Sequence, residues 1–356
     1  MRIEVDVAQF RAALSRAARA AAPASVTGAL TAVLIEAREG GAVTVTGTDL
    51  NGWLWAACPA VVEAPGAALV PARVAAALFG SLDRREAVLS AAGGLLEVRC
   101  GGRYSLVAAD PDGFPRPPRA GGEPVSAPGG VLRRALEQVL VAVPRDESSK
   151  LGAVCWEPAG LLVGTDAVRL AVAPCVPPPG GQRLVLPVSA AALGRLLPDG
   201  EVSVRASGTV VELSWDAGGA VLRTVGTGYP DWRRVAEVPP RVTARAELGD
   251  LAAAFERVKA AAGEEFPAAT VRVCPAGMEV TLASSRGKAR EEVPCSADGE
   301  ISVRFDCSLV LDGLGALARS DVSEVVWAFS GEAGASLISA PQEGSYRYVL
   351  LPLRPQ

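Results

Sequence analysis

The sequence has no histidine, and this absence excludes many kinds of catalytic site. Ser-His-Asp and Cys-His nucleophile systems, histidine general bases and zinc sites with a histidine ligand all require that side chain. The seven cysteines contain no Cys-x-x-Cys pair, so a clustered zinc or redox centre is not expected either. They are typical of buried, reduced thiols in a cytosolic protein. We therefore expect no catalytic group, no cofactor and no metal.

Long apolar segments are also absent. The first ten residues carry acidic side chains and lack the apolar region of a signal peptide. The longest uncharged stretch, residues 20–35, is too short to cross a bilayer and is broken by Pro23 and Gly28. Because 49% of the residues are hydrophobic, the chain can bury a substantial core, and we expect a soluble cytoplasmic protein.

What the chain does contain is a threefold repeat with a period close to 118 residues. Each copy begins with an amphipathic helix, continues with a hairpin and a second helix, and ends with further strands. The expected first helices cover residues 7–22, 130–143 and 250–262, and the second helices cover 72–82, 188–197 and 307–318. Equivalent residues keep the period, since Asp49 and Asp166 lie 117 residues apart. A period this long predicts three copies of one α+β domain, each with its own core.

Segments rich in proline and glycine separate the copies and set the expected boundaries. The first segment covers residues 110–130, and the second lies near residues 237–242. The predicted domains are therefore 1–119, 125–240 and 241–356, each with two helices packed on antiparallel sheets.

Two Gly-Thr-Asp triplets, which end at Asp49 and Asp166, are the one enzyme-like feature. Equivalent aspartates in two repeats resemble an aspartic dyad, in which two carboxylates share a proton. The third copy has Ala283-Ser284-Ser285 instead, and an aspartate that caps the turn at a strand end is the favoured interpretation. A hydrolase that uses the two aspartates stays open as an alternative.

Arginine makes up 32 of the 35 basic residues and recurs on the expected helices. Arg16 and Arg19 share a face opposite the apolar stripe of the first helix. A single such arginine is usually only solvated, but recurrence on equivalent helices favours a basic surface within a chain of net charge −4. Such a surface binds phosphates without reading bases. The candidate residues are Arg16, Arg19, Arg73, Arg133, Arg134, Arg195, Arg257 and Lys259.

Several short motifs together resemble the bacterial DNA sliding clamp family, the beta subunit of DNA polymerase III. They are Gly47-Thr48-Asp49-Leu50, Val70-Pro71-Ala72-Arg73, GTDAVRLA at 164–171, YPDWRRV at 229–235 and YVLLPLR at 348–354. The resemblance covers essentially the whole chain, in order and with the family's three-repeat spacing. No single motif is specific, but the set is.

The resemblance implies a head-to-tail homodimer that forms a ring of six like domains around duplex DNA. The basic helix residues named above would then face the DNA, without sequence preference. The implied role is a processivity factor of DNA replication, associated with the nucleoid. Its implied partners are the alpha subunit of the replicative polymerase, the clamp loader, repair polymerases and mismatch-repair proteins. The alternatives are a specialised second clamp and a repeat-built scaffold that binds proteins without encircling DNA.

The resemblance also implies a cleft for partner peptides between the second and third domains. Its apolar floor would take Leu and Phe anchors, with arginine on the rim. The matching positions are Leu151, Thr165, Ala167, Val168, Arg169, Leu170, Pro230, Arg234, Val235, Val349, Leu350, Leu351, Pro352, Leu353 and Arg354. Ala167-Val168 stands where the family usually has Gly-His, and Ser148 replaces an arginine of some members. These departures predict a more apolar cleft.

For the contact between subunits, the resemblance implies residues from both ends of the chain. They are Arg99, Arg103, Tyr104, Ala260, Ala261, Glu291 and Glu292. Tyr104 would meet the two small alanines, while the two glutamates would pair with the two arginines as rim charges worth little each. Because Ala260 and Ala261 are small, a weaker dimer or a second specialised clamp stays open as an alternative.

Overall fold

The structure is a computed structural model, and it describes residues 1–146, 148–226, 228–237, 239–342 and 344–354. Within these residues one order of elements occurs three times: a strand, a helix, a group of four or five strands, a second helix and three strands. We call each occurrence a copy. The recurrence of helices and strands agrees with the threefold pattern of the sequence.

The copies have the following bounds. The first comprises β1 (Arg2–Asp6), α1 (Val7–Ala18), β2 (Ala32–Arg38), β3 (Ala42–Thr48), β4 (Gly52–Ala64), β5 (Gly66–Pro71), α2 (Ala72–Ser81), β6 (Glu86–Ala92), β7 (Leu95–Cys100) and β8 (Gly102–Val107). The second comprises β9 (Val125–Pro128), α3 (Gly129–Val139), β10 (Ala153–Glu157), β11 (Leu161–Thr165), β12 (Arg169–Pro174), β13 (Leu184–Pro187), α4 (Val188–Leu193), β14 (Glu201–Ser207), β15 (Val210–Trp215) and β16 (Gly218–Arg223). The third comprises β17 (Val242–Glu247), α6 (Leu248–Ala260), β18 (Ala268–Cys274), β19 (Gly277–Ala283), β20 (Lys288–Val293), β21 (Cys295–Ala297), β22 (Ile301–Asp306), α7 (Cys307–Leu317), β23 (Glu324–Phe329), β24 (Ser336–Ser339) and β25 (Arg347–Leu350). The short helix α5 (Arg233–Ala236) lies in the segment before β17.

The helices begin within two residues of the expected positions and end earlier than expected. Asp6 caps α1, because its carboxylate accepts a hydrogen bond from the backbone N–H of Gln9 at 3.0 Å. The helix ends at Ala18, four residues before the expected end, since the following alanines close tight turns. Pro23 disfavours helical backbone at the residue before it, so the helix cannot resume.

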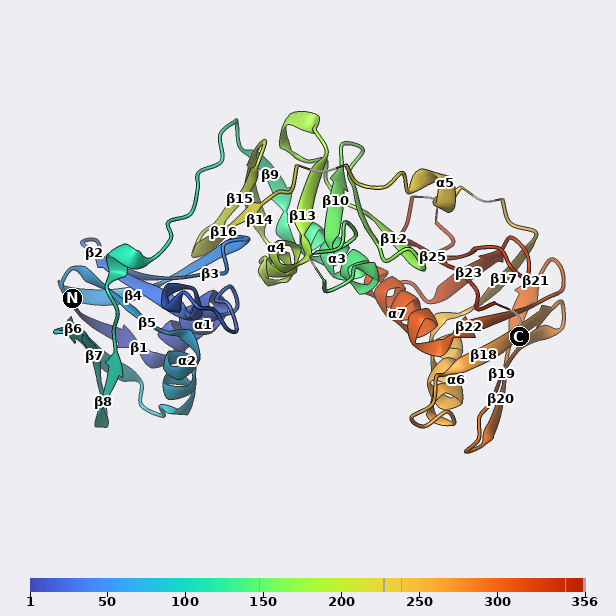
Figure 1. The fold of residues 1–356 in the computed structure, drawn as a ribbon, viewed down its shortest axis with the longest axis horizontal. Helices are drawn as coiled ribbons and strands as arrows, with labels where there is room; N and C mark the ends of the chain where they lie inside the picture. The colour runs from blue at the N-terminus through green and yellow to red at the C-terminus, as the bar shows by residue number, and fades with distance from the viewer. Residues whose placement is uncertain (147, 227, 238, 343, 355–356) are drawn as a thin grey trace. The chain divides into compact units, whose positions relative to one another are not determined.

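The chain forms two compact units. Unit 1, residues 1–130 and 196–226, contains a twelve-stranded antiparallel sheet. Its main path runs β8-β7-β6-β1-β4-β16-β15-β14-β9, and β2, β3 and β5 join it through β4. Helices α1 and α2 lie side by side against this unit's strands (Figure 1). Between them, the ring centroids of Phe10 and Phe79 are 4.7 Å apart. Both phenylalanines are fully buried.

Unit 2, residues 131–195 and 227–356, contains two antiparallel sheets. The larger has the order β13-β10-β11-β12-β25-β24-β23-β17-β21, and the smaller has the order β20-β19-β18-β22. Helices α6 and α7 pack together in this unit. Gln138 ties α3 to the same group, because its side-chain amide donates to the carbonyl of Ala316 at 3.1 Å.

In both units, the last strand of one copy pairs with a strand of the copy before it. Strand β16 pairs with β4, and β25 pairs with β12. We call these two pairings the seams. They explain why the compact units divide the second copy, whose strands β9 and β14–β16 belong to unit 1. The fold is α+β with antiparallel sheets, as the sequence predicts, and no helix of the described residues is long and apolar enough to cross a membrane.

Candidate functional site

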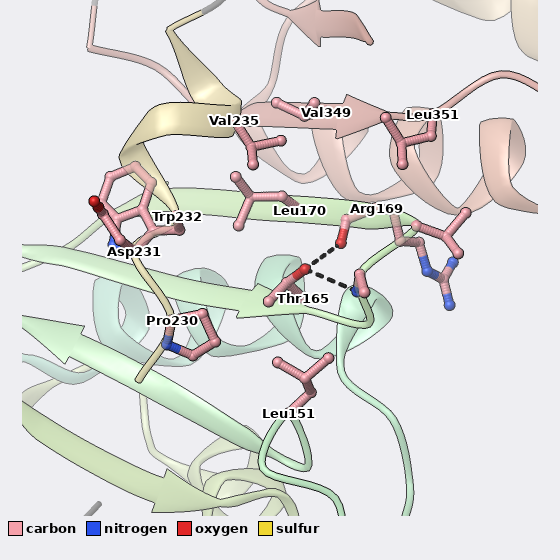
Figure 2. Close-up of a pocket in the computed structure, with 12 residues that line it drawn as sticks. Leu151, Thr165, Arg169, Leu170, Pro230, Asp231, Trp232, Val235, Val349 and Leu351 are labelled. Carbon is pink, nitrogen blue, oxygen red and sulfur yellow. Dashed lines mark hydrogen bonds between the residues drawn. The ribbon is translucent and has the colours of Figure 1, made fainter. Parts of the chain in front are cut away.

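Unit 2 contains an apolar surface pocket of about 460 Å³ at the seam between β12 and β25 (Figure 2). Its walls come from the turn before β12, from the end of β25 and from the segment around α5. The lining residues are Leu151, Thr165, Ala167, Val168, Arg169, Leu170, Pro230, Asp231, Trp232, Val235, Val349 and Leu351. This volume lies within the usual range of ligand pockets in proteins.

A tight turn at residues 165–169 forms one wall. The Thr165 hydroxyl donates to the carbonyl of Arg169 at 2.7 Å and accepts from the backbone N–H of Ala167 at 3.2 Å. The Asp166 carboxylate accepts from the backbone N–H groups of Val168 and Arg169 at 3.0 and 2.9 Å. Ala167 has a φ of 73°, a left-handed conformation that side chains other than glycine seldom adopt. The turn leaves Val168 46% exposed beside the pocket.

Arg169 is fixed within unit 2 and is not free to swing over the pocket. Its guanidinium donates to Asp166 at 2.9 Å and to Asp312 of α7 at 2.5 Å. It also lies 3.5 Å from the hydroxyl of Tyr348. Burial works against the charged form, but Tyr348 and the two aspartates outweigh it and raise the pKa of Arg169 above its ordinary value. The charge is therefore compensated inside the wall.

The end of β25 forms the opposite wall. The backbone N–H of Leu351 donates to the carbonyl of Val168 at 2.9 Å, which continues the pairing of β25 with β12 beyond the strand. Val349 lines the pocket and Leu351 is 39% exposed, whereas Leu350 points to the other side of the strand and is fully buried. The exposed leucine is available to a ligand at no cost to the core.

Trp232 closes the third side, and a buried carboxylate holds it there. The indole N–H of Trp232 donates to Glu157 at 3.0 Å, and the guanidinium groups of Arg183 and Arg233 lie 3.1 and 3.3 Å from the same carboxylate. Burial disfavours the Glu157 carboxylate, but the Trp232 hydrogen bond and the two arginines outweigh this effect and lower its pKa below the ordinary value. Glu157 therefore stays charged at neutral pH and orients the wall.

Of the fifteen positions suggested for the peptide cleft, ten line this pocket. The other five are Arg234, Leu350, Pro352, Leu353 and Arg354. Arg234 is exposed and lies 3.2 Å from Asp231. Two lining residues, Asp231 and Trp232, were missed, although both stand inside the YPDWRRV motif.

The eight basic residues suggested for DNA lie on or directly after α1, α2, α3, α4 and α6. Their surroundings differ. Arg257 donates to both oxygens of Glu291 at 3.0 and 2.7 Å, Arg134 lies 3.9 Å from Asp321, and Arg16 stacks over Trp215. Arg133 and Lys259 are half-buried. Arg19, Arg73 and Arg195 are exposed and form no ion pair with the described residues.

The residues suggested for the subunit contact lie at two sheet edges. Arg99 is on β7, while Arg103 and the 39% exposed Tyr104 are on the edge strand β8 of unit 1. Glu291 and Glu292 are on the edge strand β20 of unit 2, and Ala260 and Ala261 end α6 in the same unit. Glu291 is engaged by Arg257 of its own chain, so a bridge from it to another subunit competes with that pair.

The two aspartates of the hydrolase alternative cap turns. Asp49 accepts from the backbone N–H groups of Asn51 and Gly52, both at 2.9 Å, as Asp166 does in its own turn. They lie in different compact units. This geometry accounts for both residues without catalysis.

Comparisons with known proteins place the whole chain among sliding clamps. The beta sliding clamp of Streptomyces coelicolor is 27% identical over 384 residues, which cover 99% of each chain. That of Caulobacter vibrioides is 29% identical over 203 residues, which cover 54% of this chain and 53% of that one. No family model matches the chain.

Solved structures show the same fold over the full length. The DNA polymerase sliding clamp of Bacillus subtilis has a TM-score of 0.90 at 21% identity, and the clamp of Pseudomonas aeruginosa bound to griselimycin has a TM-score of 0.89 at 23% identity. Both comparisons cover 100% of each chain.

The fold and the full-length relative define a sliding clamp, a class of replication protein without catalytic activity. Over its full length the chain is similar to the beta sliding clamp, the beta subunit of DNA polymerase III. The interpretation of the chain as a hydrolase is therefore wrong.

Proposed function

We propose that two copies of the chain close into a ring around duplex DNA and tether the replicative polymerase and other replication and repair proteins through the unit 2 pocket. The proposed domains are 1–119, 125–240 and 241–356, and within them residues 147, 227, 238, 343 and 355–356 lie outside the described part of the chain. The setting would be the cytoplasm, at the nucleoid. The observation that carries the proposal is the full-length clamp fold with an apolar, exposed pocket at one seam.

The two seams support ring closure. In each seam the last strand of a copy pairs with the third strand after the first helix of the copy before it. Two strands at the corresponding positions are sheet edges, with a neighbouring strand on one side only among the described residues. They are β8, the last strand of the first copy, and β20, the third strand after the first helix of the third copy. Pairing β8 of one chain with β20 of another would repeat the seam between chains. A head-to-tail contact of this kind closes into a ring when the rotation fits.

The exposed arginines support contact with DNA. Arg19, Arg73 and Arg195 follow or belong to helices and carry uncompensated charge among the described residues. Weak contacts to phosphates, which salt screens, suit a ring that must slide. Topological closure, and not affinity, would keep the ring on its template.

The decisive experiment is retention on nicked circular DNA, loaded with the cognate clamp loader and ATP. The chain should stay with the circle during gel filtration and be lost after a single cut linearises the DNA. Light scattering should give a dimer near twice 36.4 kDa. Equal retention before and after the cut would mean ordinary binding. No retention on the circle, with normal binding of a polymerase tail peptide, would favour the scaffold alternative.

A charge test addresses the DNA-facing residues. The double variant Arg19→Glu, Arg73→Glu should load less and show a weaker dependence on salt. The matched control is Arg205→Glu, Arg272→Glu, which reverses two exposed arginines on strands. Equal loading of the two double variants would remove these helices from the proposed DNA surface.

The pocket is tested by truncation. Removal of residues 351–356 should abolish binding of a Leu- and Phe-containing polymerase tail peptide, because it removes Leu351 from the wall. The cut begins after Leu350, whose buried side chain and paired backbone belong to the fold. Thermal melting of the truncated chain provides the control, and unchanged peptide affinity would refute the assignment.

A further inference from the structure

Unit 1 carries a second surface groove, of about 390 Å³, where the segment after β8 crosses the sheet. We call it the linker groove, and its lining includes Glu36, Arg38, Trp55, Phe114, Arg116, Pro117, Arg119 and Glu212. It lies in a different compact unit from the pocket of Figure 2 and shares no residue with it. The proposed function does not involve it.

The repeat gives each residue of the linker groove a counterpart in unit 2. Ala32 of β2 and Ala153 of β10 both pair with the proline that ends the strand before the second helix. Counting four residues on from each alanine, Glu36 corresponds to Glu157. The crossing segments also align, as Gly-Phe-Pro at 113–115 and Gly-Tyr-Pro at 228–230. Two residues after the shared proline, Pro117 corresponds to Trp232.

In unit 2 the corresponding place is filled by the protein itself. Trp232 is 5% exposed, belongs to the core cluster on the sheet and donates its indole N–H to Glu157. Pro117 has neither the size of an indole nor a donor, so the equivalent place in unit 1 is left as a groove.

The floor and walls of the linker groove suit an aromatic ring. Trp55 is packed against Gly219, where an added Cβ would come within 2.0 Å of its ring, so the indole is fixed as a floor. Phe114 is buried beside it and prolines form the wall. Glu36 stands at the edge, and both of its ion pairs, to Arg116 at 2.8 Å and to Arg38 at 4.0 Å, use Oε1. An indole N–H that enters the groove therefore meets a carboxylate placed as Glu157 is placed for Trp232.

The rim favours a negatively charged ligand. Arg119 is exposed and forms no ion pair with the described residues, and the side chains of Arg38 and Arg116 are 82% and 54% exposed. The two acidic lining residues already have partners, because Glu36 binds arginine and Glu212 accepts from the backbone N–H of Ala120 at 3.2 Å. Clusters of arginine recognise acidic motifs, and the guanidinium group also stacks on aromatic faces.

We propose that the linker groove binds an acidic peptide segment of a partner protein, which inserts one tryptophan side chain into the place that Trp232 fills in unit 2. The indole N–H donates to Glu36, the ring lies on Trp55, and carboxylates on either side of the tryptophan meet Arg38, Arg116 and Arg119.

The test is a calorimetric titration of the full chain, at low ionic strength, with the synthetic peptide acetyl-Asp-Glu-Trp-Glu-Asp-amide. The peptide should bind, and replacing its tryptophan by alanine or its acids by lysine should weaken binding at least tenfold. Pro117→Trp, which supplies the missing indole from the chain itself, should also weaken binding at least tenfold. Pro124→Trp, an exposed proline of the same unit outside the groove, should leave the affinity within twofold.

Two further variants separate loss of binding at the linker groove from a folding defect and from binding at the unit 2 pocket. Arg119→Glu changes an exposed side chain and should weaken binding at least fivefold even where Pro117→Trp disturbs folding. Leu351→Arg, in the pocket of unit 2, should leave binding of this peptide unchanged. The proposal is overturned if the peptide does not bind at chain concentrations up to about 1 mM, if Pro117→Trp folds and binds normally, or if Leu351→Arg abolishes binding.

Discussion

The Thr-Asp turns of the two units have the same backbone conformation but different surroundings. In unit 1 the Thr48 hydroxyl donates to the carbonyl of Gly52 at 2.8 Å, and Leu50 has a φ of 76°. In unit 2 the Thr165 hydroxyl donates to the carbonyl of Arg169 at 2.7 Å, and Ala167 has a φ of 73°. The turn is therefore a structural device of the repeat, and its presence does not by itself make a binding site.

The neighbours of each turn decide what it does. In unit 1 the backbone N–H of Arg223 donates to Asn51 at 2.8 Å, as that of Leu351 donates to Val168 in unit 2. The guanidinium of Arg223 then stacks over Trp53 at 5.5 Å, so a cation and a large ring cover the surface. In unit 2 the corresponding residues are aliphatic, and the surface stays open and apolar. Side chains on the seam, and not the turn, separate the covered surface of unit 1 from the proposed binding site of unit 2.

The largest expected effect is a loss of stability on removal of Trp232, which is buried against the larger sheet of unit 2. Trp232→Ala should cost about 3–5 kcal/mol of stability, because it leaves a cavity and removes a hydrogen bond from a buried carboxylate. The counterpart Pro117→Ala should change stability by less than about 1 kcal/mol. Urea unfolding measures both changes in stability. Equal losses would mean that Pro117 is packed as tightly in unit 1 as Trp232 is in unit 2.

A smaller effect is expected from exchanging the seam residues. Leu351→Arg places in unit 2 the arginine that stands at the corresponding position of unit 1, Arg223. It should weaken binding of a Leu- and Phe-containing tail peptide about tenfold or more, because apolar burial is lost. Because Leu351 is exposed, the melting temperature should hardly change. The reciprocal variant Arg223→Leu should not alter peptide affinity, and a tenfold loss there would show that the peptide binds elsewhere.

The contribution of the buried Glu157 carboxylate to the stability of the chain depends on pH. The pKa of Glu157 is lowered in the folded chain, so its stabilisation is complete above its ordinary value of about 4.3 and is lost as the pH falls through the folded value. Glu157→Gln should cost about 1–2 kcal/mol at pH 7, an estimate kept small because Arg183 and Arg233 are more than a third exposed.

Thermal melts from pH 7 downward should show the gap between Glu157→Gln and the unchanged chain closing below about pH 4. The matched variant Glu36→Gln should cost less than about 1 kcal/mol, because Arg116 is more than half exposed. A gap that persists unchanged at low pH would exclude the charge of Glu157 as its origin.

The smallest effect concerns the turn that both units share. Ala167→Gly should stabilise the chain by about 0.5 kcal/mol, since relief of the left-handed conformation slightly exceeds the entropy cost of glycine. Leu50→Gly tests the same turn in unit 1. Destabilisation of more than about 1 kcal/mol by Ala167→Gly would mean that its methyl group contributes to the wall.

Helices and hairpins were predictable from the sequence because their signals are local. The apolar stripe of α1 and the hairpin of β2 and β3 appear where periodicity and turn residues put them. The seams were not predictable in this way, since β16 and β25 pair with strands far away in the sequence. For the pocket, resemblance supplied ten lining positions, but it did not supply Glu157, whose role depends on a hydrogen bond to Trp232.

The seams also affect how the chain folds as it is synthesised. Residues 52–56 of β4 pair with residues 218–222 of β16, so this part of β4 lacks one of its two neighbouring strands until the second copy has almost left the ribosome. At roughly 5–20 residues per second, the wait is about 10–30 seconds. During that time the nascent chain presents an open strand edge to other nascent chains, including those on the same polysome. We therefore expect the yield of folded chain to depend on how well this edge is protected until β16 arrives.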